Sequence, residues 1–404
     1  MQQIIFINRY FYPDLSATSQ MLGDLVFGLN KSNCEIHIVT SRQRYDDANA
    51  VLASLETING IVVHRVWTTR FGRQALLGRA ADYFTFYLSA AVSLLKITRA
   101  GAIIVAKTDP PLISIVAAVV AAIKSARLIN WLQDLFPEVA AELGIKVIRG
   151  PVYTLLKNLR NFTLKRAEKN IVLGDLMAQR LEREGIPADK IAIISNWADG
   201  RQIQPVPHSD NPLRAAWDLE QKFVVGYSGN LGRSHDFLTI LEAARKLSDD
   251  TDIVFLFIGA GAQLGSVREQ TQALSLSNIE FRPYQPRSEL ANSLSVPDVH
   301  LISLKPELEG LIVPSKFYGI IAAGRPTIFI GDLDGEIPRL LKGYECGIAV
   351  QQGDVSTLAS EIRSLKNNPG RVRHFSEQAR KTFDAHYEMT IAISEWARQL
   401  RLDR

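Results

Sequence analysis

Two segments in the second half of the chain carry the residue types that bind a phosphate-containing anion. The first, GYSGNLGRSHD, runs from Gly226 to Asp236 and follows an apolar stretch. Glycines such as Gly229 let backbone N–H groups approach a ligand closely, and Arg233 adds a forked donor for phosphate oxygens. A glycine turn with a purely structural role is the alternative. We expect a diphosphate site that includes Gly229, Asn230 and Arg233.

The second segment, EGLIVPSKFYG, spans residues 309–319. A helix is expected to begin near Pro314 or Ser315, because proline suits the first helical turn and serine can cap it. Lys316 would then lie beside exposed backbone N–H groups, an arrangement that attracts an anion. An ordinary capped helix with a solvated lysine is the alternative. Both segments follow strands, so we expect them to meet in one cleft.

Carboxylates end several strands of the first half. Asp134 follows the apolar run LINWL and precedes Glu138 in the fragment QDLFPE. Either carboxylate could bind a substrate hydroxyl or accept its proton, with Asp134 the leading candidate. Asp109 ends another strand, and Asp14 lies in the amino-terminal loop. These two are candidates for contact with a second substrate, although a strand-end aspartate can also serve as a turn or a cap.

Short aliphatic runs alternate with helical segments throughout, which is typical of parallel sheets covered on both faces. Strands of the first half are expected at residues 4–8, 35–40, 62–66, 102–107, 128–132, 170–174 and 191–195. Helices between them are expected at 19–31, 78–98, 112–124, 150–166 and 176–184. In the second half, strands are expected at 223–229, 252–259, 278–283, 299–304, 326–331 and 347–351.

The alternation breaks at a proline-containing stretch between the halves, and 404 residues exceed the usual size of one core. The sequence therefore predicts an α/β protein with two Rossmann-like, doubly wound domains. Their expected limits are 1–200 and 222–385, joined by a linker at 201–221. A final helical segment, 386–404, is expected to pack back on the first domain. Two such domains would face each other across a cleft at the carboxyl ends of both sheets.

Composition excludes several classes of protein. The two cysteines, Cys34 and Cys346, are too few for a disulfide framework and have no neighbouring histidine or cysteine for a zinc site. No export signal is visible at the amino terminus. The longest apolar run, 112–123, is shorter than the roughly 20 residues that span a bilayer. We therefore expect a cytoplasmic protein with no metal.

Charge is distributed unevenly along the chain. Residues 1–200 contain 23 basic and 17 acidic residues, whereas 201–404 contain 23 and 25. One stretch of the first half mixes apolar residues with the basic residues Lys146, Arg149, Lys157, Arg160, Lys165, Arg166 and Lys169. A second stretch, 65–99, has the same character. Such helices either present a solvated polar face or contact anionic lipid headgroups. Nucleic acid is not expected, because no nucleic-acid-binding module is visible.

Four motifs together resemble glycosyltransferase family 4, the retaining enzymes of GT-B architecture. They are YSGNLGRSHDF, FIGAGA, VPSKFYGIIAAGRPTIFIG and WLQDLFPE. Within the family, the chain is similar to transferases that assemble colanic acid and O-antigen. The resemblance covers nearly the whole chain and is most specific between residues 309 and 331. It implies transfer of a sugar from a nucleoside diphosphate donor, with retained anomeric configuration and neither metal nor other cofactor.

The resemblance also implies roles for the donor residues. Arg233 and Lys316 would bind the diphosphate, assisted by backbone groups between Gly310 and Lys316, a segment that includes Leu311, Pro314 and Ser315. Tyr284 belongs to a loop that resembles the one holding the nucleobase. Ala17, Thr18 and Ser19 occupy the place of paired glycines near the donor phosphates of many relatives.

Two departures from the family pattern concern the reactive groups. Many relatives have two glutamates where this chain has Leu311 and Gly319, so Glu309 is expected to substitute or the sugar contacts differ. Gln133 replaces the histidine of a His-Asp pair, and a glutamine cannot carry a proton. Asp134 thereby gains importance in the first domain.

From these features we expect a UDP-sugar donor, ahead of a GDP-sugar, and a polyprenyl-diphosphate-linked saccharide acceptor. The enzyme would be peripherally associated with the inner face of the cell membrane. Two alternatives stay open. Gln133 and Gly319 would also suit a non-catalytic subunit of the same fold, and a nucleotide-sugar epimerase would need no acceptor.

Overall fold

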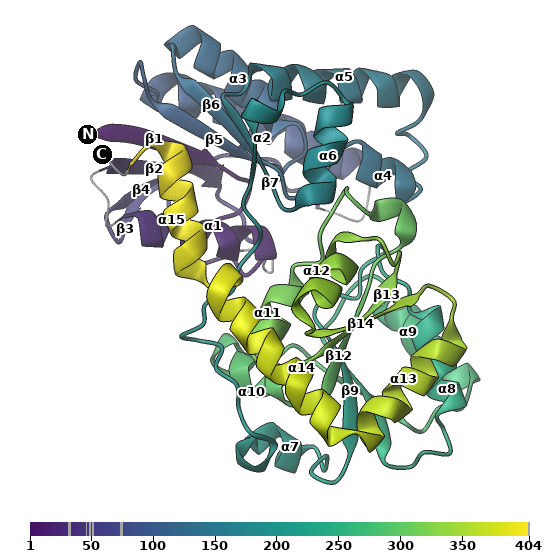
Figure 1. The fold of residues 1–404 in the computed structure, drawn as a ribbon. Coiled ribbons are helices and arrows are strands. Elements are labelled where there is room, and N and C mark those ends of the chain that lie inside the picture. The colour runs from purple at the N-terminus through teal and green to yellow at the C-terminus, as the bar shows by residue number, and fades with distance from the viewer. Residues whose placement is uncertain (31–33, 46, 48–49, 51, 73–75, 403–404) are drawn as a thin grey trace. The chain divides into compact units, whose positions relative to one another are not determined.

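The computed structural model describes residues 1–30, 34–45, 47, 50, 52–72 and 76–402. The described chain forms two compact units, each built on its own sheet (Figure 1). The first unit contains residues 1–195 and 392–404, and the second contains residues 196–391. The predicted two-domain α/β architecture is therefore present.

The first unit contains an eight-stranded sheet in the order β3-β4-β2-β1-β5-β6-β7-β8. Its strands are β1 (Gln2–Ile7), β2 (Cys34–Ser41), β3 (Leu55–Ile58), β4 (Ile61–Val66), β5 (Ile103–Lys107), β6 (Arg127–Trp131), β7 (Lys169–Val172) and β8 (Ile191–Ile193). All neighbours pair in parallel except β3 with β4. The direction of strand order reverses between β1 and β5, which creates a switch point at their carboxyl ends.

Strand β3 was not predicted. It pairs with β4 through a two-residue turn at Asn59 and Gly60, whose φ angles are 49° and 84°. Positive φ at both central positions is the hairpin turn that the sequence Asn-Gly favours. That dipeptide was the signal by which the sequence could have revealed β3.

Helices cover both faces of the first sheet. They are α1 (Ala17–Leu29), α2 (Leu76–Ile97), α3 (Ile113–Lys124), α4 (Glu138–Glu142), α5 (Gly150–Arg166), α6 (Asp175–Arg183) and α15 (Met389–Leu400). Side chains of α2 and α3, including Phe86 and Ala117, pack with Ile5 and Ile104 in one core. Because strand crossovers are right-handed, α2, α3 and α5 share one face of this sheet, and α1 covers the opposite face. Figure 1 shows α3 and α5 side by side at the outer edge of the unit.

Residues of the carboxyl-terminal helix α15 complete the core of the first unit. Trp396 is fully buried and meets the Trp131 ring edge-on at 4.8 Å between ring centroids. On the same helix Ile393 packs so closely on Gly28 that a Cβ there would lie 2.2 Å from Cδ1 of Ile393. Although residues 392–404 come last in the chain, they belong to the first unit.

The second unit contains a parallel six-stranded sheet in the order β11-β10-β9-β12-β13-β14. Its strands are β9 (Phe223–Ser228), β10 (Ile253–Ile258), β11 (Ile279–Arg282), β12 (Val299–Ser303), β13 (Thr327–Gly331) and β14 (Gly347–Gln351). Its helices are α7 (Pro212–Ala216), α8 (Leu238–Lys246), α9 (Leu264–Ala273), α10 (Leu290–Ser295), α11 (Lys316–Ala322), α12 (Glu336–Tyr344), α13 (Val355–Asn367) and α14 (Pro369–Thr382). This order is that of a dinucleotide-binding fold, with its switch point between β9 and β12.

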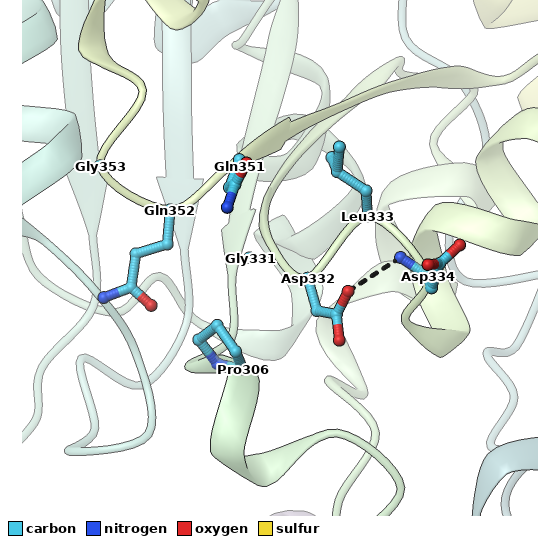
Figure 2. A pocket seen from close by; sticks show the side chains of 8 residues that line it. All are labelled: Pro306, Gly331, Asp332, Leu333, Asp334, Gln351, Gln352 and Gly353. Atoms are coloured by element: carbon cyan, nitrogen blue, oxygen red, sulfur yellow. Dashed lines mark hydrogen bonds between the residues drawn. The ribbon is translucent and has the colours of Figure 1, made fainter.

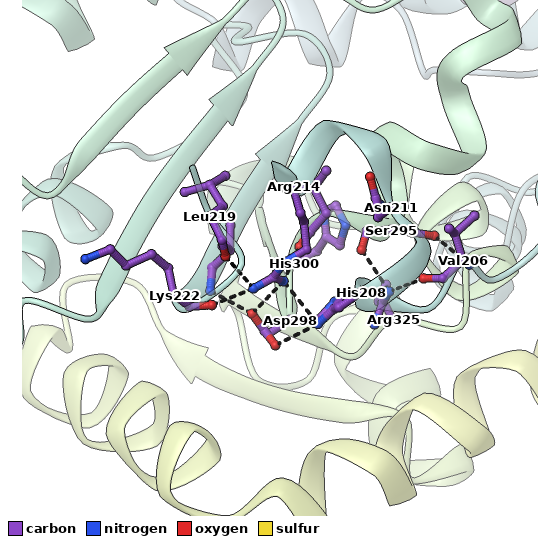
Figure 3. A network of polar contacts seen from close by, with 12 residues as sticks. Val206, His208, Asn211, Arg214, Leu219, Lys222, Ser295, Asp298, His300 and Arg325 are labelled. Carbon is purple, nitrogen blue, oxygen red and sulfur yellow. Dashed lines mark hydrogen bonds and ion pairs between the residues drawn. The ribbon is translucent and has the colours of Figure 1, made fainter. Parts of the chain in front are cut away.

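The segment predicted to be a linker, 201–221, is part of the second unit and is held by a buried arginine. Arg214 of α7 is 2% exposed and lies at the centre of a polar network (Figure 3). Its guanidinium donates to the carbonyl oxygens of Val296, Leu219 and Lys222 at 2.7, 2.9 and 2.6 Å. It also pairs with the Asp298 carboxylate at 3.2 Å. Five donors in a rigid fork let one side chain satisfy several buried acceptors.

Substitution Arg214→Lys should lower the free energy of unfolding of the second unit by about 1–3 kcal/mol, because one ammonium leaves buried acceptors unsatisfied. Urea unfolding followed by tryptophan fluorescence measures the change. Arg201→Lys, at an exposed position of the same segment, is the matched control. Equal stability of the two variants would contradict the role of the network.

Candidate active site

The two predicted anion-binding segments meet at the switch point of the second unit. The turn at Gly229 follows β9, and Lys316 opens α11 after the loop that follows β12. A Cβ added to Gly229, whose φ is 118°, would lie 3.7 Å from Cε of Lys316. The lysine side chain therefore passes directly over the glycine turn, as the sequence predicts.

Glycines of the motif FIGAGA allow a second loop to pack under this turn. A Cβ on Gly259 would lie 2.1 Å from the Gly229 carbonyl oxygen, and one on Gly261 would lie 2.5 Å from the Asn230 carboxamide oxygen. Both glycines have φ angles, 143° and 156°, that side chains rarely adopt. Close contact between the loops fixes the backbone around Gly229 and Asn230 before any ligand binds.

The surroundings of Lys316 favour the uncharged form of its amine in the free protein. Its Nζ donates to the Tyr227 hydroxyl at 2.5 Å and lies 3.7 Å from the centre of that ring. Burial without a carboxylate partner lowers the pKa of Lys316 to about 7. An anion that binds here would therefore favour the protonated, positively charged form of Lys316.

Tyr227 was not predicted as a site residue, because it lies inside strand β9 and belongs to the expected core. Its hydroxyl accepts from Lys316 and donates to the Asn230 carbonyl oxygen at 3.1 Å. Burial, followed by the nearby Tyr284, raises the pKa of Tyr227 well above its ordinary value. Tyr284 itself is exposed on the loop after β11, so the predicted nucleobase loop lies close to this cluster.

Substitution Tyr227→Phe should weaken binding of a nucleoside diphosphate by about 3- to 10-fold, because it removes one hydrogen bond that orients Lys316. Calorimetry measures the affinity. Tyr344→Phe, on α12 of the same unit, is the matched control. An affinity equal to that of the unsubstituted protein would assign Tyr227 to packing alone.

Arg233 is exposed on the turn between β9 and α8. Its guanidinium has no hydrogen-bond or ion-pair partner among the described residues, although the backbone around it is fixed. Gln263 donates to the carbonyl oxygens of Gly232 and His235 at 2.6 and 3.2 Å. Arg233 thus offers its donors to solvent beside the glycine turn, and its contact with a phosphate stays a prediction.

Several contacts of the segment 309–319 differ from those predicted. Helix α11 begins at Lys316, and Ser315 occupies the N-cap position without a side-chain capping bond. Leu311 cannot offer its N–H to a ligand, because that group donates to the Leu308 carbonyl oxygen at 3.0 Å and closes a turn. The Leu311 side chain is also fully buried, as is most of Pro314. Gly310, with a φ of 71°, supplies the left-handed position of that turn.

Glu309 and Gly319 have structural contacts that sequence reasoning did not reveal. One oxygen of Glu309 accepts the Glu336 N–H at 3.2 Å, where α12 begins. Burial, with Asp332 and Glu336 nearby, raises the pKa of Glu309 to about 7. A Cβ at Gly319 would lie 3.3 Å from Leu294, so this position faces an apolar core. The expected substitution of Glu309 for the family's ribose-binding glutamate therefore remains a prediction that no contact within the second unit supports.

A polar hollow of about 540 Å³ lies at the carboxyl ends of β13 and β14 (Figure 2). It is lined by Pro306, Gly331, Asp332, Leu333, Asp334, Gln351, Gln352 and Gly353. Carboxylates accept hydrogen bonds, whereas glutamine side chains both donate and accept them, so the hollow suits the hydroxyls of a sugar. The sequence did not predict it, because its residues come from three separate loops.

The switch point of the first unit brings two of the predicted carboxylates together. Asp109 follows β5 and Asp134 follows the neighbouring β6. Burial, followed by the negative charge of Asp109, raises the pKa of Asp134 to about 6, against a hydrogen bond from Thr108. A carboxylate with this pKa is ionised near neutral pH and can still accept a proton.

Two other predicted carboxylates already have partners inside the fold. Glu138, the alternative to Asp134, is 2% exposed and pairs with Arg160 at 2.7 Å, so its charge is already neutralised inside the fold. Asp14 is 3% exposed and accepts the Ser16 N–H at 2.8 Å as well as the backbone N–H of Tyr45. These bonds stabilise the amino-terminal loop, and they leave Asp14 little freedom to bind an acceptor.

Ala17, Thr18 and Ser19 form the first turn of α1, two residues earlier than the helix was predicted to start. Ala17 is exposed and Thr18 half-buried, whereas Ser19 is 1% exposed. Their predicted proximity to the donor stays a prediction. Among the described residues, no group of three or more His, Cys, Asp or Glu side chains could hold a metal ion. No described helix is long and apolar enough to cross a membrane.

Two family models match the chain, one in each unit. Residues 17–197 match the family described as "Glycosyl transferase 4-like domain", and residues 210–382 match "Glycosyl transferases group 1". The chain belongs to the glycosyltransferases. This assignment confirms the resemblance drawn from the motifs.

Relatives of this glycosyltransferase agree with its family. It is 28% identical to a protein named glycosyltransferase WbjE, from Pseudomonas aeruginosa, over 73% of this chain and 74% of the relative. It is 26% identical to one named colanic acid biosynthesis glycosyl transferase WcaI, from Escherichia coli strain K12, over 65% of this chain and 66% of the relative.

The fold of the glycosyltransferase is also shared with solved structures. Anabaena HepE, crystallised with UDP and glucose, matches with a TM-score of 0.75 at 14% identity, over 99% of this chain and 100% of HepE. The transferase has two parallel-sheet α/β domains of the GT-B type, as predicted.

Proposed function

We propose that the protein is a retaining glycosyltransferase that transfers a sugar from a UDP-sugar to a polyprenyl-diphosphate-linked saccharide. The carrying observation is the Lys316 ammonium over the Gly229 turn, at the switch point of a dinucleotide-binding fold. A diphosphate supplies the negative charge that this half-buried ammonium lacks. The structure of Anabaena HepE with UDP supports the choice of nucleotide.

Lys316 and Arg233 would bind the donor diphosphate and stabilise its charge as the sugar leaves. This is an electrostatic task, and donors fixed in advance perform it without rearrangement. The rigid packing of Gly259 and Gly261 on the turn supplies that fixed geometry. With two cationic side chains at the leaving group, the proposed reaction uses no metal ion.

Asp134 is the proposed reactive carboxylate of the first unit. Its carboxylate would accept the proton of the acceptor hydroxyl or hold a hydroxyl of the donor sugar. Asp109, on the adjacent strand end, would contact the acceptor. The acceptor is attached to a lipid, so the enzyme would work in the cytoplasm at the inner face of the cell membrane.

Binding of UDP and GDP, measured by calorimetry, tests the donor site first. Micromolar binding of UDP, with GDP weaker, supports the proposal, whereas tighter GDP binding would reassign the base. If neither binds, the non-catalytic alternative replaces this proposal. Nuclear magnetic resonance of the product then reports the anomeric configuration, and inversion would overturn the retaining mechanism. Activity that persists in EDTA is expected.

A further inference from the structure

The outer surface of α2, α3 and α5 is apolar where helices of a protein in water are normally polar. Nine large apolar side chains of these helices are between 44% and 84% exposed. They are Leu77, Phe84, Leu88, Val92, Val119, Ile123, Val152, Leu155 and Phe162. We call them the three-helix surface. Large contiguous patches of this kind on a protein mark sites of association.

The three helices present these residues side by side. Ser114 of α3 and Thr163 of α5 lie 3.1 Å apart through their hydroxyls, and α2 packs with α3 in the core. On α2 the exposed positions Leu77, Phe84 and Leu88 recur at helical spacing, while the intervening Phe86 is fully buried. The exposed side of α2 therefore carries a stripe of large apolar residues, where a helix face towards water is normally polar.

The second unit has no comparable surface among its described residues. Its exposed large apolar side chains are Leu238, Tyr284, Leu333 and Ile391, which belong to separate elements. Isolated exposed residues of this kind are normal. The accumulation on the first unit is thus a local feature and not a property of the whole chain.

The charges on the same helices indicate which kind of partner the three-helix surface binds. The only acidic residue within α2, α3 and α5 is Asp82, which is 1% exposed. Basic residues stand at the ends of the apolar surface: Lys96, Lys124, Lys165 and Arg166 at the carboxyl ends of the helices, and Arg149 at the start of α5. Lys96, Lys165, Arg166 and Arg149 are exposed.

We infer that the three-helix surface docks on an anionic lipid bilayer, with its apolar side chains inserted below the headgroups and its basic ends paired with lipid phosphates. Apolar insertion combined with cationic flanks is how helices bind such an interface. A second copy of the chain would place like charges against each other. This inference extends the proposed function. It rests on that function only for the statement that the lipid of the acceptor lies in the same bilayer.

Docking in this way has a geometric consequence within the first unit. Helices α2, α3 and α5 each start at the carboxyl edge of the parallel sheet, where Asp109 and Asp134 follow their strands. The amino-terminal end of the surface therefore adjoins the carboxylates proposed for the acceptor. Helix α3 contributes to the three-helix surface, although neither of the two basic stretches identified in the sequence includes it.

Sedimentation of the full chain with vesicles tests the surface without nucleotide or acceptor. The protein should pellet with vesicles of phosphatidylcholine and phosphatidylglycerol, and at least tenfold less with phosphatidylcholine alone. Leu88→Glu should reduce binding at least tenfold, because Leu88 is 55% exposed within the apolar surface. Leu238→Glu, at a leucine 58% exposed in the second unit, is the matched control and should bind like the unsubstituted protein.

A charge-reversed variant, Lys96→Glu with Lys165→Glu, should lose binding to anionic vesicles, while Lys342→Glu on α12 should not. Unchanged vesicle binding by Leu88→Glu would overturn the inference. So would a dimer, seen by ultracentrifugation, that Leu88→Glu dissociates. The circular dichroism spectrum and thermal unfolding midpoint of each variant, which should not change, show that it is folded. If the chain bound vesicles but no nucleotide, this result would contradict only the proposed transferase function and would leave the membrane inference standing.

Discussion

Substitution Lys316→Ala should weaken UDP binding by about 10- to 100-fold, the value of one charge-assisted hydrogen bond. The ammonium lies over the Gly229 turn and beside Tyr227, so alanine removes the positive charge from that place while Arg233 remains beside the turn. Calorimetry measures the loss. Lys342→Ala, an exposed lysine of α12, is the matched control and should bind UDP normally.

The same lysine makes binding depend on pH. Burial lowers the pKa of Lys316 to about 7, so near neutral pH much of the free protein has an uncharged amine at this position. A bound diphosphate favours the ammonium and raises its pKa, so binding takes up a proton. UDP should therefore bind more tightly at about pH 6 than at about pH 9. Lys316→Ala should remove this dependence. A dependence that persists in the variant would assign it to another group.

Substitution Asp134→Asn should reduce turnover by about 10²- to 10⁴-fold while UDP affinity stays nearly unchanged. Asparagine keeps the shape of the side chain but cannot accept a proton. Because the pKa of Asp134 is about 6, turnover of the unsubstituted enzyme should fall as the pH drops through that value. Steady-state rates with donor and acceptor measure both effects.

Glu138→Gln is the informative control for Asp134. It breaks a buried ion pair with Arg160, so it should reduce stability more than turnover. If Asp134→Asn instead weakened UDP binding and left turnover intact, its assigned role would be wrong. If Glu138→Gln alone abolished turnover in a folded protein, Glu138 would regain the role that its burial argues against.

Strand ends explain why so much of the site was predictable. Gly229, Lys316, Asp109 and Asp134 all follow parallel strands, and such ends converge wherever the order of strands reverses. The runs of aliphatic residues identified those strands, apart from the hairpin strand β3. Residue type at a strand end is therefore enough to place a side chain at the correct edge of a sheet.

Side-chain pairing could not be predicted in the same way. Glu138 meets Arg160, and Glu309 meets the start of α12, through contacts between segments more than 20 residues apart. Each such contact depends on the packing of whole helices, which no local pattern reports. Tyr227 was not predicted because its local sequence pattern is simply that of a buried strand. Its strand looked like ordinary core, and only the position of Lys316 gives its hydroxyl a function.

The placement of α15 in the first unit has a consequence for how the chain folds during synthesis. Domains generally fold in order as they leave the ribosome. Here residues 1–195 emerge first, but the helix that covers Trp131 is made only after all of residues 196–391. The second unit can therefore complete its core before the first does. Until Trp396 arrives, the nascent first unit keeps an uncovered tryptophan face, the kind of surface that chaperones bind.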